Sequence, residues 1–186
     1  YIKSLVPYYR LLIPVVLPDY VAKIVYFDAD MVADADLSKI YDEVPEDKLM
    51  AAVIELVANA HKDTVLSHLK QWPEFSKFNK DSFSAPYFNA GFFLMNLNLA
   101  REMNIFDDFM AFLSKHANPP YADQDTLNAI CGQKYTEKMW YLEPAWNVFA
   151  DMCFSEIVYG RVGYPHYLVR QAFANPYIYH YAGPNK

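Results

Sequence analysis

The sequence is poor in the features that mark several common protein classes. It contains only two cysteines, Cys131 and Cys153, too few for a secreted domain built on disulfides. Its 16 lysine and arginine residues are outnumbered by 22 aspartate and glutamate residues, which argues against the basic patch of a nucleic-acid-binding protein. Apolar runs such as residues 91–95 fall far short of the ~20 residues that a membrane-spanning helix needs.

Targeting and low-complexity features are also missing. The chain opens without the basic and apolar regions of a secretory signal, and it carries no Asn-x-Ser/Thr sequon and no repeat. Apolar residues make up 54% of its 186 residues, enough for a buried core in one domain of ordinary length. We therefore expect a single soluble domain, residues 1–186, in a reducing compartment.

Aromatic and acidic residues, by contrast, are abundant. The 16 tyrosines, 13 phenylalanines and 3 tryptophans make up 17% of the chain. Most belong in a core, although tyrosine also suits surfaces that bind sugars, because its ring packs on C–H groups while its hydroxyl reaches a polar group. Residues 28–47 carry eight acids against one base, Lys39. This stretch is either a solvated loop and helix start or a site that attracts cations.

Hydrophobic patterns predict strands that alternate with helices. Short apolar or β-branched runs are the strand candidates, at 23–27, 49–56, 87–97, 139–142 and 177–180. Strands that alternate with helices are typical of an α/β fold with a mostly parallel central sheet flanked by helices. Ligands of such sheets gather at the carboxyl ends of the strands.

Five helices are expected between and around these strands. They are a largely buried helix at 5–17, one at about 36–44 with Asp36 as its cap, one at 59–69, one after residue 97, and one at 123–130. The helix after residue 97 has apolar residues at spacings of 4, 3, 4 and 3, which predicts one buried face formed by Leu99, Met103, Phe106, Met110 and Leu113.

A pair of carboxylates follows the first predicted strand. Asp28 and Asp30, separated by Ala29, stand where the apolar run 24–27 ends. Two carboxylates in this arrangement can bind one hard divalent cation such as Mg²⁺ or Mn²⁺, which commonly completes its shell with substrate phosphates. An Asp-x-Asp pair is also common on surfaces, so a solvated turn is the alternative.

The segment 177–186 could complete such a site. His180 ends an apolar stretch and could supply an imidazole to the same cation. Gly183 would let the backbone approach an anion closely, and Lys186 would place a positive charge on phosphate. The alternative is a core histidine followed by an ordinary Gly-Pro turn. We interpret the other four histidines as structural.

Two polar tripeptides have both a functional and a structural interpretation. Asn-Ala-Gly at 89–91 interrupts an aromatic strand, which indicates close approach of a ligand, a β-bulge or a crossing of sheets. Asp-Gln-Asp at 123–125 opens a predicted helix, where acids commonly cap the helix and complement its dipole. The functional alternative is that these side chains bind sugar hydroxyls or face a reacting carbon.

Taken together, five stretches in this order resemble the family 8 retaining glycosyltransferases, the group that contains glycogenin and bacterial lipopolysaccharide galactosyl- and glucosyltransferases. The stretches span nearly the whole chain and are SLVPYYRL at 4–11, VYFDAD at 25–30, FNAGFFLMN at 88–96, DQDTLN at 123–128 and HYAGPNK at 180–186. The resemblance implies a GT-A fold and a UDP-hexose donor. It also implies a saccharide or lipid-linked glycan acceptor and a divalent cation, usually Mn²⁺, with Mg²⁺ as the alternative.

The resemblance also implies roles for single residues. Asp28, Asp30 and His180 would be the metal ligands. The other donor-binding residues would be Arg10, Ala29, Asn89, Ala90, Asp123, Gln124, Gly183 and Lys186. Gln124 corresponds to the family residue nearest the anomeric carbon, and Asp125 is the neighbouring carboxylate, so these two are the catalytic candidates. Because an amide is a poor nucleophile, we favour front-face attack by the acceptor hydroxyl over double displacement through Asp125.

The sequence departs from the family pattern at both ends. Family members begin with a strand–helix unit that carries nucleoside-binding residues, and they continue past the final lysine with a basic, aromatic tail that meets the membrane or the acceptor. We therefore expect a partial GT-A domain without its first strand–helix unit. The absence of a signal and of sequons favours the bacterial branch. We expect a cytoplasmic enzyme of lipopolysaccharide biosynthesis, with peripheral inner-membrane contact through the missing tail.

Two other functions remain open. One is a UDP-sugar-binding remnant without turnover. The other is a metal-dependent nucleotidyltransferase or phosphohydrolase, which also needs paired carboxylates. That second class predicts a second metal or an in-line water, whereas the sequence indicates one cation site.

Overall fold

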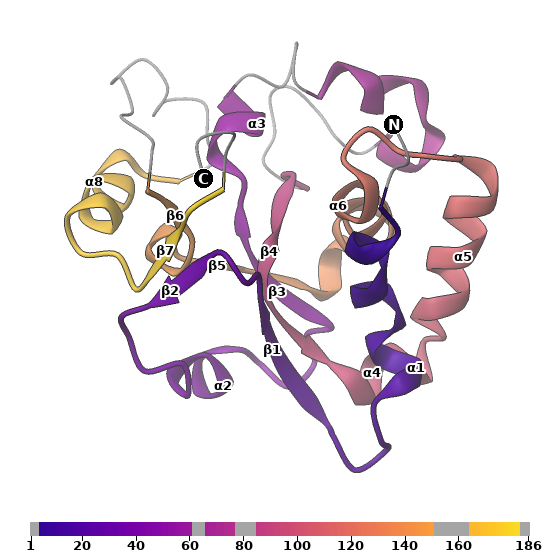
Figure 1. The fold of residues 1–186 in the computed structure, drawn as a ribbon, viewed down its shortest axis with the longest axis horizontal. Helices are drawn as coiled ribbons and strands as arrows, with labels where there is room; N and C mark the ends of the chain where they lie inside the picture. Colours follow the sequence, from indigo (N-terminus) through magenta and orange to yellow (C-terminus); the bar gives the residue numbers. More distant parts are fainter. Residues whose placement is uncertain (1–3, 61–65, 77–84, 151–163, 183–186) are drawn as a thin grey trace.

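The structure is a computed structural model of the chain, and it describes residues 4–60, 66–76, 85–150 and 164–182. Two sheets lie side by side, with helices around them (Figure 1). The larger sheet has the strand order β1-β4-β3-β5, with β1 at Lys23–Phe27, β4 at Phe88–Asn96, β3 at Met50–Ile54 and β5 at Met139–Leu142. The smaller sheet has the order β2-β7-β6, with β2 at Met31–Ala33, β7 at Ile178–His180 and β6 at Val148–Phe149.

Helices and short helical turns connect the strands. The α-helices are α1 Ile13–Val16, α2 Lys39–Glu43, α3 Leu56–Ala60, α4 Leu97–Glu102, α5 Ile105–Lys115, α6 Ala122–Leu127 and α8 His166–Ala174. The 3-10 turns are η1 Val6–Leu12, η2 Ser67–Gln71, η3 Pro73–Phe75, η5 Thr136–Lys138 and η6 Pro144–Trp146, and η4 Asn128–Lys134 continues α6 as a π-helical segment. Within the described ranges, no helix has the length and apolar composition that crossing a bilayer requires.

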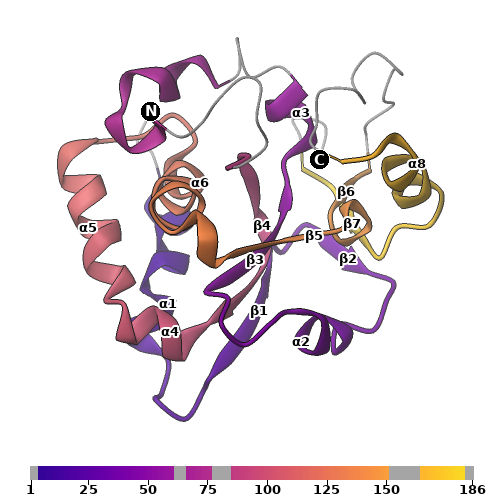
Figure 2. The same cartoon turned by 180° about the vertical axis from the view of Figure 1, so that it is seen from behind.

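The two faces of the larger sheet carry separate apolar cores. On one face, Phe93 of β4 packs with Phe109 of α5, in the layer formed by α1, α4, α5 and α6 (Figure 2). On the other face, Phe92 packs with Ile40 of α2 and stacks on the ring of Trp146, with ring centroids 5.9 Å apart. Since successive side chains of a strand point to opposite faces, the wholly buried β4 supplies both cores.

All five predicted strands are present in an α/β arrangement, but their directions differ from the prediction. β4 runs antiparallel to both β1 and β3, and of the three strand pairs in the larger sheet only β3 and β5 are parallel. The expectation of a mostly parallel sheet is therefore wrong. A strand buried on both faces suggests a parallel sheet, but here helices and the smaller sheet bury an antiparallel strand equally well. The short strands β2 and β6 are not predicted, because two or three residues carry no usable alternation.

A bulge in β4 shapes the site. Ala52 of β3 pairs with Phe93 and Ile54 pairs with Phe88, so one residue of β3 lies opposite four residues of β4, 89–92. A bulge of this kind bends the strand and re-aims its side chains, and bulges are common next to active sites. The polar tripeptide at 89–91 therefore marks a bulge, one of the predicted alternatives.

The helix predicted after residue 97 is two helices. Asn104 has a left-handed φ of 52° and separates α4 from α5. The break turns α5 so that Ile105, Phe109 and Phe112 are buried while Met110 is 39% exposed. The predicted single apolar face through Met110 is therefore wrong, because the spacing holds only if one helix continues through Asn104.

Three other helix predictions need correction. The segment 5–17 is helical as η1 and α1, but Leu5, Val6 and Val16 are exposed, so it is not largely buried. The helix predicted at 59–69 is wrong in its bounds, because α3 covers Leu56–Ala60 and the next described turn is η2. The prediction that Asp36 caps the helix at 36–44 is also wrong, because α2 begins at Lys39 with Ser38 as its N-cap. The Asp36 carboxylate instead accepts a 2.9 Å hydrogen bond from the Ser38 amide, in the turn before α2.

Candidate active site

An open cleft of about 310 Å³ lies where β1 ends, beside the β4 bulge and the start of α6. Eight of the residues predicted from the sequence line it: Arg10, Asp28, Asp30, Asn89, Ala90, Asp123, Gln124 and His180. Gly183 and Lys186, predicted to hold the diphosphate, lie outside the described residues. Ala29 is exposed and is not among the residues that line the cleft.

Asp28, Asp30 and His180 converge at one point of the cleft. One ligand atom from each lies within 4.8 Å of the others. The chain holds them there through backbone pairing: Asp28 N–H donates to Gly91 O at 2.9 Å, and Tyr181 N–H donates to Asp30 O at 2.9 Å. Two carboxylates and one imidazole form a donor set that fits a divalent transition metal such as Mn²⁺.

Arg10 organises one side of the cleft, and we call Arg10, Asp28 and Asp123 the charged wall. Its Nη2 lies 2.9 Å from Asp28 Oδ1, its Nε lies 2.9 Å from Asp123 Oδ2, and its Nη1 donates to Ala90 O at 2.6 Å. Its guanidinium also lies 4.5 Å above the centre of the Tyr26 ring. The resemblance assigns Arg10 to the donor, whereas these contacts tie its guanidinium to protein groups from three segments: the end of β1, β4 and α6.

Burial dominates the electrostatics of Asp123. Loss of water raises the pKa of its carboxyl to about 6, although Arg10 opposes the rise. Repulsion from Asp28 and Asp125 adds to the rise. The charged wall therefore includes a carboxylate that takes up a proton under mildly acidic conditions.

Asp125, within α6, is fully buried and does not line the cleft. Its Oδ1 accepts from the Tyr87 hydroxyl at 2.7 Å, and its Oδ2 accepts from the Tyr121 amide at 2.9 Å and lies 3.2 Å from His68 Nε2. Asp125 is therefore not among the residues that line the cleft, and its catalytic role stays a prediction that these contacts do not support. Its contacts instead connect α6 to η2 through His68.

A chain of hydrogen-bonded side chains, which we call the amide wall, runs along the other side of the cleft. It consists of Asn89, Gln124 and His180, which line the cleft, and of Asn147, which contacts two of them but is not among the lining residues. The Gln124 Oε1 atom accepts from Ala90 N–H at 2.9 Å and from Asn89 Nδ2 at 3.3 Å. Asn147 connects Asn89 to His180 with contacts of 2.9 Å on both sides. The sequence reasoning missed Asn147. The available signal was one amide inside the apolar stretch 144–150, which also indicates an ordinary loop.

Gly91 allows this packing. A Cβ atom at this position would lie 2.8 Å from His180 Cε1, 2.8 Å from the Met31 methyl carbon and 2.9 Å from Asn89 Oδ1. Real side chains do not approach so closely, so the bulge needs a glycine at 91 for His180 to sit against β4.

The fold and the cleft define the class of protein. The chain matches the structure of WbbM, a bifunctional glycosyltransferase, with a TM-score of 0.77 and 26% identity over 98% of this chain and 32% of that one. It also matches the galactosyltransferase LgtC, solved with donor and acceptor sugar analogues, with a TM-score of 0.64 and 22% identity over 98% of this chain and 60% of that one. The fold is the GT-A fold of glycosyltransferases, as predicted.

The family follows from the whole chain. The model of glycosyl transferase family 8 matches residues 1–186, and the protein belongs to this family. General stress protein A of Bacillus subtilis (strain 168) is 27% identical over 187 residues, which cover 96% of this chain and 57% of that protein. The chain thus spans about three fifths of this relative and a third of WbbM.

Proposed function

We propose that the protein is a metal-dependent retaining hexosyltransferase that moves a hexose from a UDP-sugar to a saccharide or lipid-linked glycan. The convergence of Asp28, Asp30 and His180 within 4.8 Å, in a cleft that also presents Gln124, carries the proposal. Family membership supports transfer of a glycosyl group. The donor and acceptor analogues bound to LgtC, which has the same fold, support a reaction between two sugar substrates.

Each side of the cleft has a task in this proposal. Asp28, Asp30 and His180 would hold the cation, which when bound supplies positive charge against the diphosphate as its negative charge develops. Asp123 and Gln124 would orient the hydroxyls of the donor sugar. Gly183 and Lys186 stay predicted contacts of the diphosphate.

We favour a front-face route for the transfer. A double displacement needs a carboxylate beneath the anomeric carbon. Asp125 is enclosed by Tyr87 and Tyr121, and Asp123 is paired with Arg10. In the front-face route the acceptor oxygen bonds to the anomeric carbon as the bond from that carbon to the diphosphate oxygen breaks. The hydroxyl proton passes to the leaving phosphate oxygen.

The choice of hexose, a role in lipopolysaccharide biosynthesis, a bacterial cytoplasmic location and contact with the inner membrane stay predictions. The choice of hexose depends on the side chains that contact the hydroxyls of the donor sugar, and the other properties depend on parts of the protein that recognise the acceptor or the membrane. The relatives extend well beyond the length matched here, so these properties belong to the whole protein.

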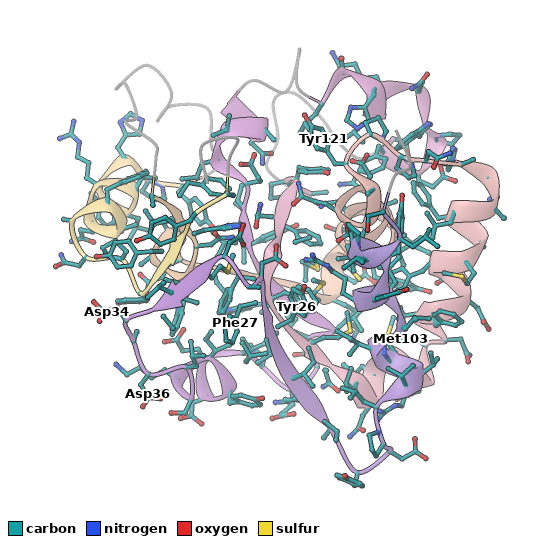
Figure 3. The ribbon with its side chains drawn as sticks, viewed as in Figure 1. Tyr26, Phe27, Asp34, Asp36, Met103 and Tyr121 are labelled. Atoms are coloured by element: carbon teal, nitrogen blue, oxygen red, sulfur yellow. The ribbon has the colours of Figure 1, made fainter. Side chains whose placement is uncertain are left out.

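Binding and turnover with one variant pair test the proposal. Asp30→Asn should weaken Mn²⁺-dependent UDP binding by more than about 100-fold, because a residue that binds the cation directly contributes at least as much to affinity as the groups that only orient such residues. Asp34→Asn is the matched control. Asp34 belongs to the same acidic stretch but is exposed and lies at the edge of the molecule, away from Tyr26 and Tyr121 (Figure 3).

Calorimetry with UDP, with and without Mn²⁺, gives the binding result. Equal binding by Asp30→Asn and the wild type would remove Asp30 from the metal site. Incubation with UDP-hexoses, Mn²⁺ and glycan acceptors then separates the functions: release of UDP that rises with acceptor supports transfer. Binding without turnover indicates a binding remnant, and release of phosphate indicates a phosphohydrolase.

A further inference from the structure

The amide wall is a continuous chain of hydrogen-bonding groups between the sugar-facing and metal-facing parts of the cleft. Gln124 Oε1 is joined to Asn89 Nδ2 at 3.3 Å, Asn89 Oδ1 to Asn147 Nδ2 at 2.9 Å, and Asn147 Oδ1 to His180 Nδ1 at 2.9 Å. Asn89, Asn147 and His180 are all buried. Since buried polar groups need partners of the right kind, the direction of each bond is constrained by its neighbours.

Two backbone amides set the direction of the whole chain. Gly91 N–H lies 2.9 Å from one side-chain atom of Asn89, and a backbone N–H can only donate, so that atom is the oxygen Oδ1. By the same reasoning the Ala90 N–H, at 2.9 Å, identifies Oε1 of Gln124. The amino group of Asn89 then faces Gln124 Oε1, which is the one arrangement that satisfies both ends.

The direction of this chain determines the tautomer of His180. Because Asn89 presents its oxygen to Asn147, the atom of Asn147 that faces it must be the donor Nδ2. Asn147 therefore turns its oxygen toward His180, and the Nδ1 of His180 must carry the proton of that bond. In the neutral ring, Nε2 then holds a lone pair, and it lies 3.5 Å from Asp30 Oδ1.

We propose that Asn147 is a positioning residue that holds His180 as the Nδ1–H tautomer, with the Nε2 lone pair directed at the point shared with Asp28 and Asp30. The proposal deepens the proposed metal site and rests on it for its purpose, although the tautomer itself can be measured without metal. Metal-binding histidines commonly donate their second ring N–H to such an outer partner, and here the partner is a side-chain amide.

The surroundings of His180 hold the ring in this orientation. The Phe149 ring lies 4.9 Å from the His180 ring, centroid to centroid, and the Ala150 N–H donates to His180 O at 2.9 Å. On the other side, Gly91 brings the β4 backbone against the imidazole. The ring is therefore packed between β4 and β6, and Asn147 decides which of its nitrogens carries the proton.

Nuclear magnetic resonance of protein labelled with ¹⁵N in histidine tests the tautomer without metal, at a pH where the imidazole is neutral. The expected spectrum shows a protonated Nδ1 and an unprotonated Nε2 for His180. Asn147→Leu, which removes both bonds at similar volume, should lose this preference. Asn147→Asp keeps an acceptor for Nδ1–H but cannot donate to Asn89, and it should retain the tautomer.

Titration with Mn²⁺ in the presence of UDP provides the second measurement. Asn147→Leu should weaken Mn²⁺ binding by about 10- to 100-fold, as expected for an outer-shell partner, and Asn147→Asp should recover most of the loss. The matched control is Asn96→Leu. Asn96 is also buried and makes two hydrogen bonds, but they go to the Leu99 amide and the Glu46 carbonyl and not to Asn89 or His180. It should lose stability without a change in tautomer or in Mn²⁺ affinity.

The outcomes separate this inference from the proposed function. A proton on Nε2 of the wild type, or a folded Asn147→Leu variant with unchanged tautomer and Mn²⁺ affinity, overturns the role of Asn147. A wild type that binds no Mn²⁺ but shows the Nδ1–H tautomer, lost in Asn147→Leu, supports the positioning and overturns the metal site.

Discussion

The two sides of the cleft are built from different chemistry on a shared support. The charged wall is held by ion pairs of Arg10 with two carboxylates, whereas the amide wall is held by neutral hydrogen bonds whose direction is set by backbone N–H groups. Both walls use the bulge of β4, which supplies Ala90 O to Arg10 and the amides of Ala90 and Gly91 to the amide wall. The stability that the charged wall provides should therefore depend on pH and on the presence of both partners of each ion pair. The amide wall should instead be sensitive to substitutions that change the packing of its side chains.

The largest effect is expected from removing the cation of the charged wall. Arg10→Ala leaves Asp28 and Asp123 without their shared partner in a largely buried position. Loss of one member of such a pair costs about 3–5 kcal/mol in the free energy of unfolding. Urea denaturation measures this loss. The tautomer of His180 should stay unchanged, because no group of the amide wall depends on the guanidinium.

Arg101 provides the matched control for Arg10. Its guanidinium donates to carbonyl oxygens of residues 14–21, including Pro14 at 3.0 Å and Leu17 at 2.9 Å, and its nearest carboxylate, that of Asp19, is fully exposed at 4.0 Å. Arg101→Ala should lower the free energy of unfolding less than Arg10→Ala does, because it leaves no buried carboxylate without a partner. If Arg10→Ala and Arg101→Ala lower the free energy of unfolding equally, the ion pairs of the charged wall do not account for the contribution of Arg10 to stability.

The second prediction concerns pH. Burial raises the pKa of Asp123 to about 6, from 3.8 in the unfolded chain. Between these values the folded protein holds a proton that the unfolded chain releases. Stability therefore falls as pH rises from about 4 to 6, by on the order of 3 kcal/mol, and the fall is complete above the folded pKa. Asp123→Asn should remove this part of the pH dependence in urea denaturation.

Glu55 tests whether that dependence belongs to the charged wall. It is buried at the start of α3, away from the cleft lining, and burial raises its pKa to about 7 from 4.5, so its own contribution falls between about pH 4.5 and 7. Glu55→Gln should leave the fall in stability below about pH 4.5 intact and reduce the fall that continues up to about pH 7. If Asp123→Asn leaves the fall in stability between about pH 4 and 6 unchanged, the assignment to Asp123 is wrong.

Adding a methyl group at position 91 should disturb the packing of the amide wall more than that of the charged wall. In Gly91→Ala the added methyl meets His180, Met31 and Asn89 at less than 3.0 Å, and overpacking of this kind costs about 1–3 kcal/mol. Displacement of His180 should also weaken Mn²⁺ binding by roughly 10-fold. Gly132→Ala is the matched control, because its new methyl would meet Phe88 and Asn128 at 3.3 Å or more. Unchanged Mn²⁺ binding in Gly91→Ala would contradict the packing argument.

The fold was predictable where burial alone decides and unpredictable where direction or conformation does. The apolar runs locate all five predicted strands, because each strand contributes side chains that are at least partly buried. The antiparallel direction of β4 could not be predicted, because helices and the smaller sheet cover both of its faces. A strand buried in this way has the same continuous apolar pattern whether it is parallel or antiparallel. The break at Asn104 is hidden for a similar reason: the apolar spacing also fits an unbroken helix.

The part of the site that was predictable consists of the residues within recognisable sequence motifs. The pair Asp28 and Asp30 and the distant His180 are brought together as expected, because β2 and β7 pair with Met31 opposite His180. The burial of Asp125 depends on contacts with His68 and Tyr87, which no local pattern indicates. The proposed role of Asn147 could likewise not be predicted from the sequence, since it depends on contacts with residues 33 and 58 positions away.

The smallest predicted effect comes from the edge of the charged wall. The Tyr26 hydroxyl donates to Asp28 Oδ1 at 2.8 Å, and burial together with this bond raises its pKa to about 12, so it stays protonated at any working pH. Tyr26→Phe removes the bond but keeps the ring, which stacks on Phe93 and lies under Arg10. Since Arg10 still bonds Asp28, the loss should be about 1 kcal/mol in urea denaturation, with less than a tenfold change in Mn²⁺-dependent UDP binding. A loss as large as that of Arg10→Ala would mean that Tyr26, rather than Arg10, orients Asp28.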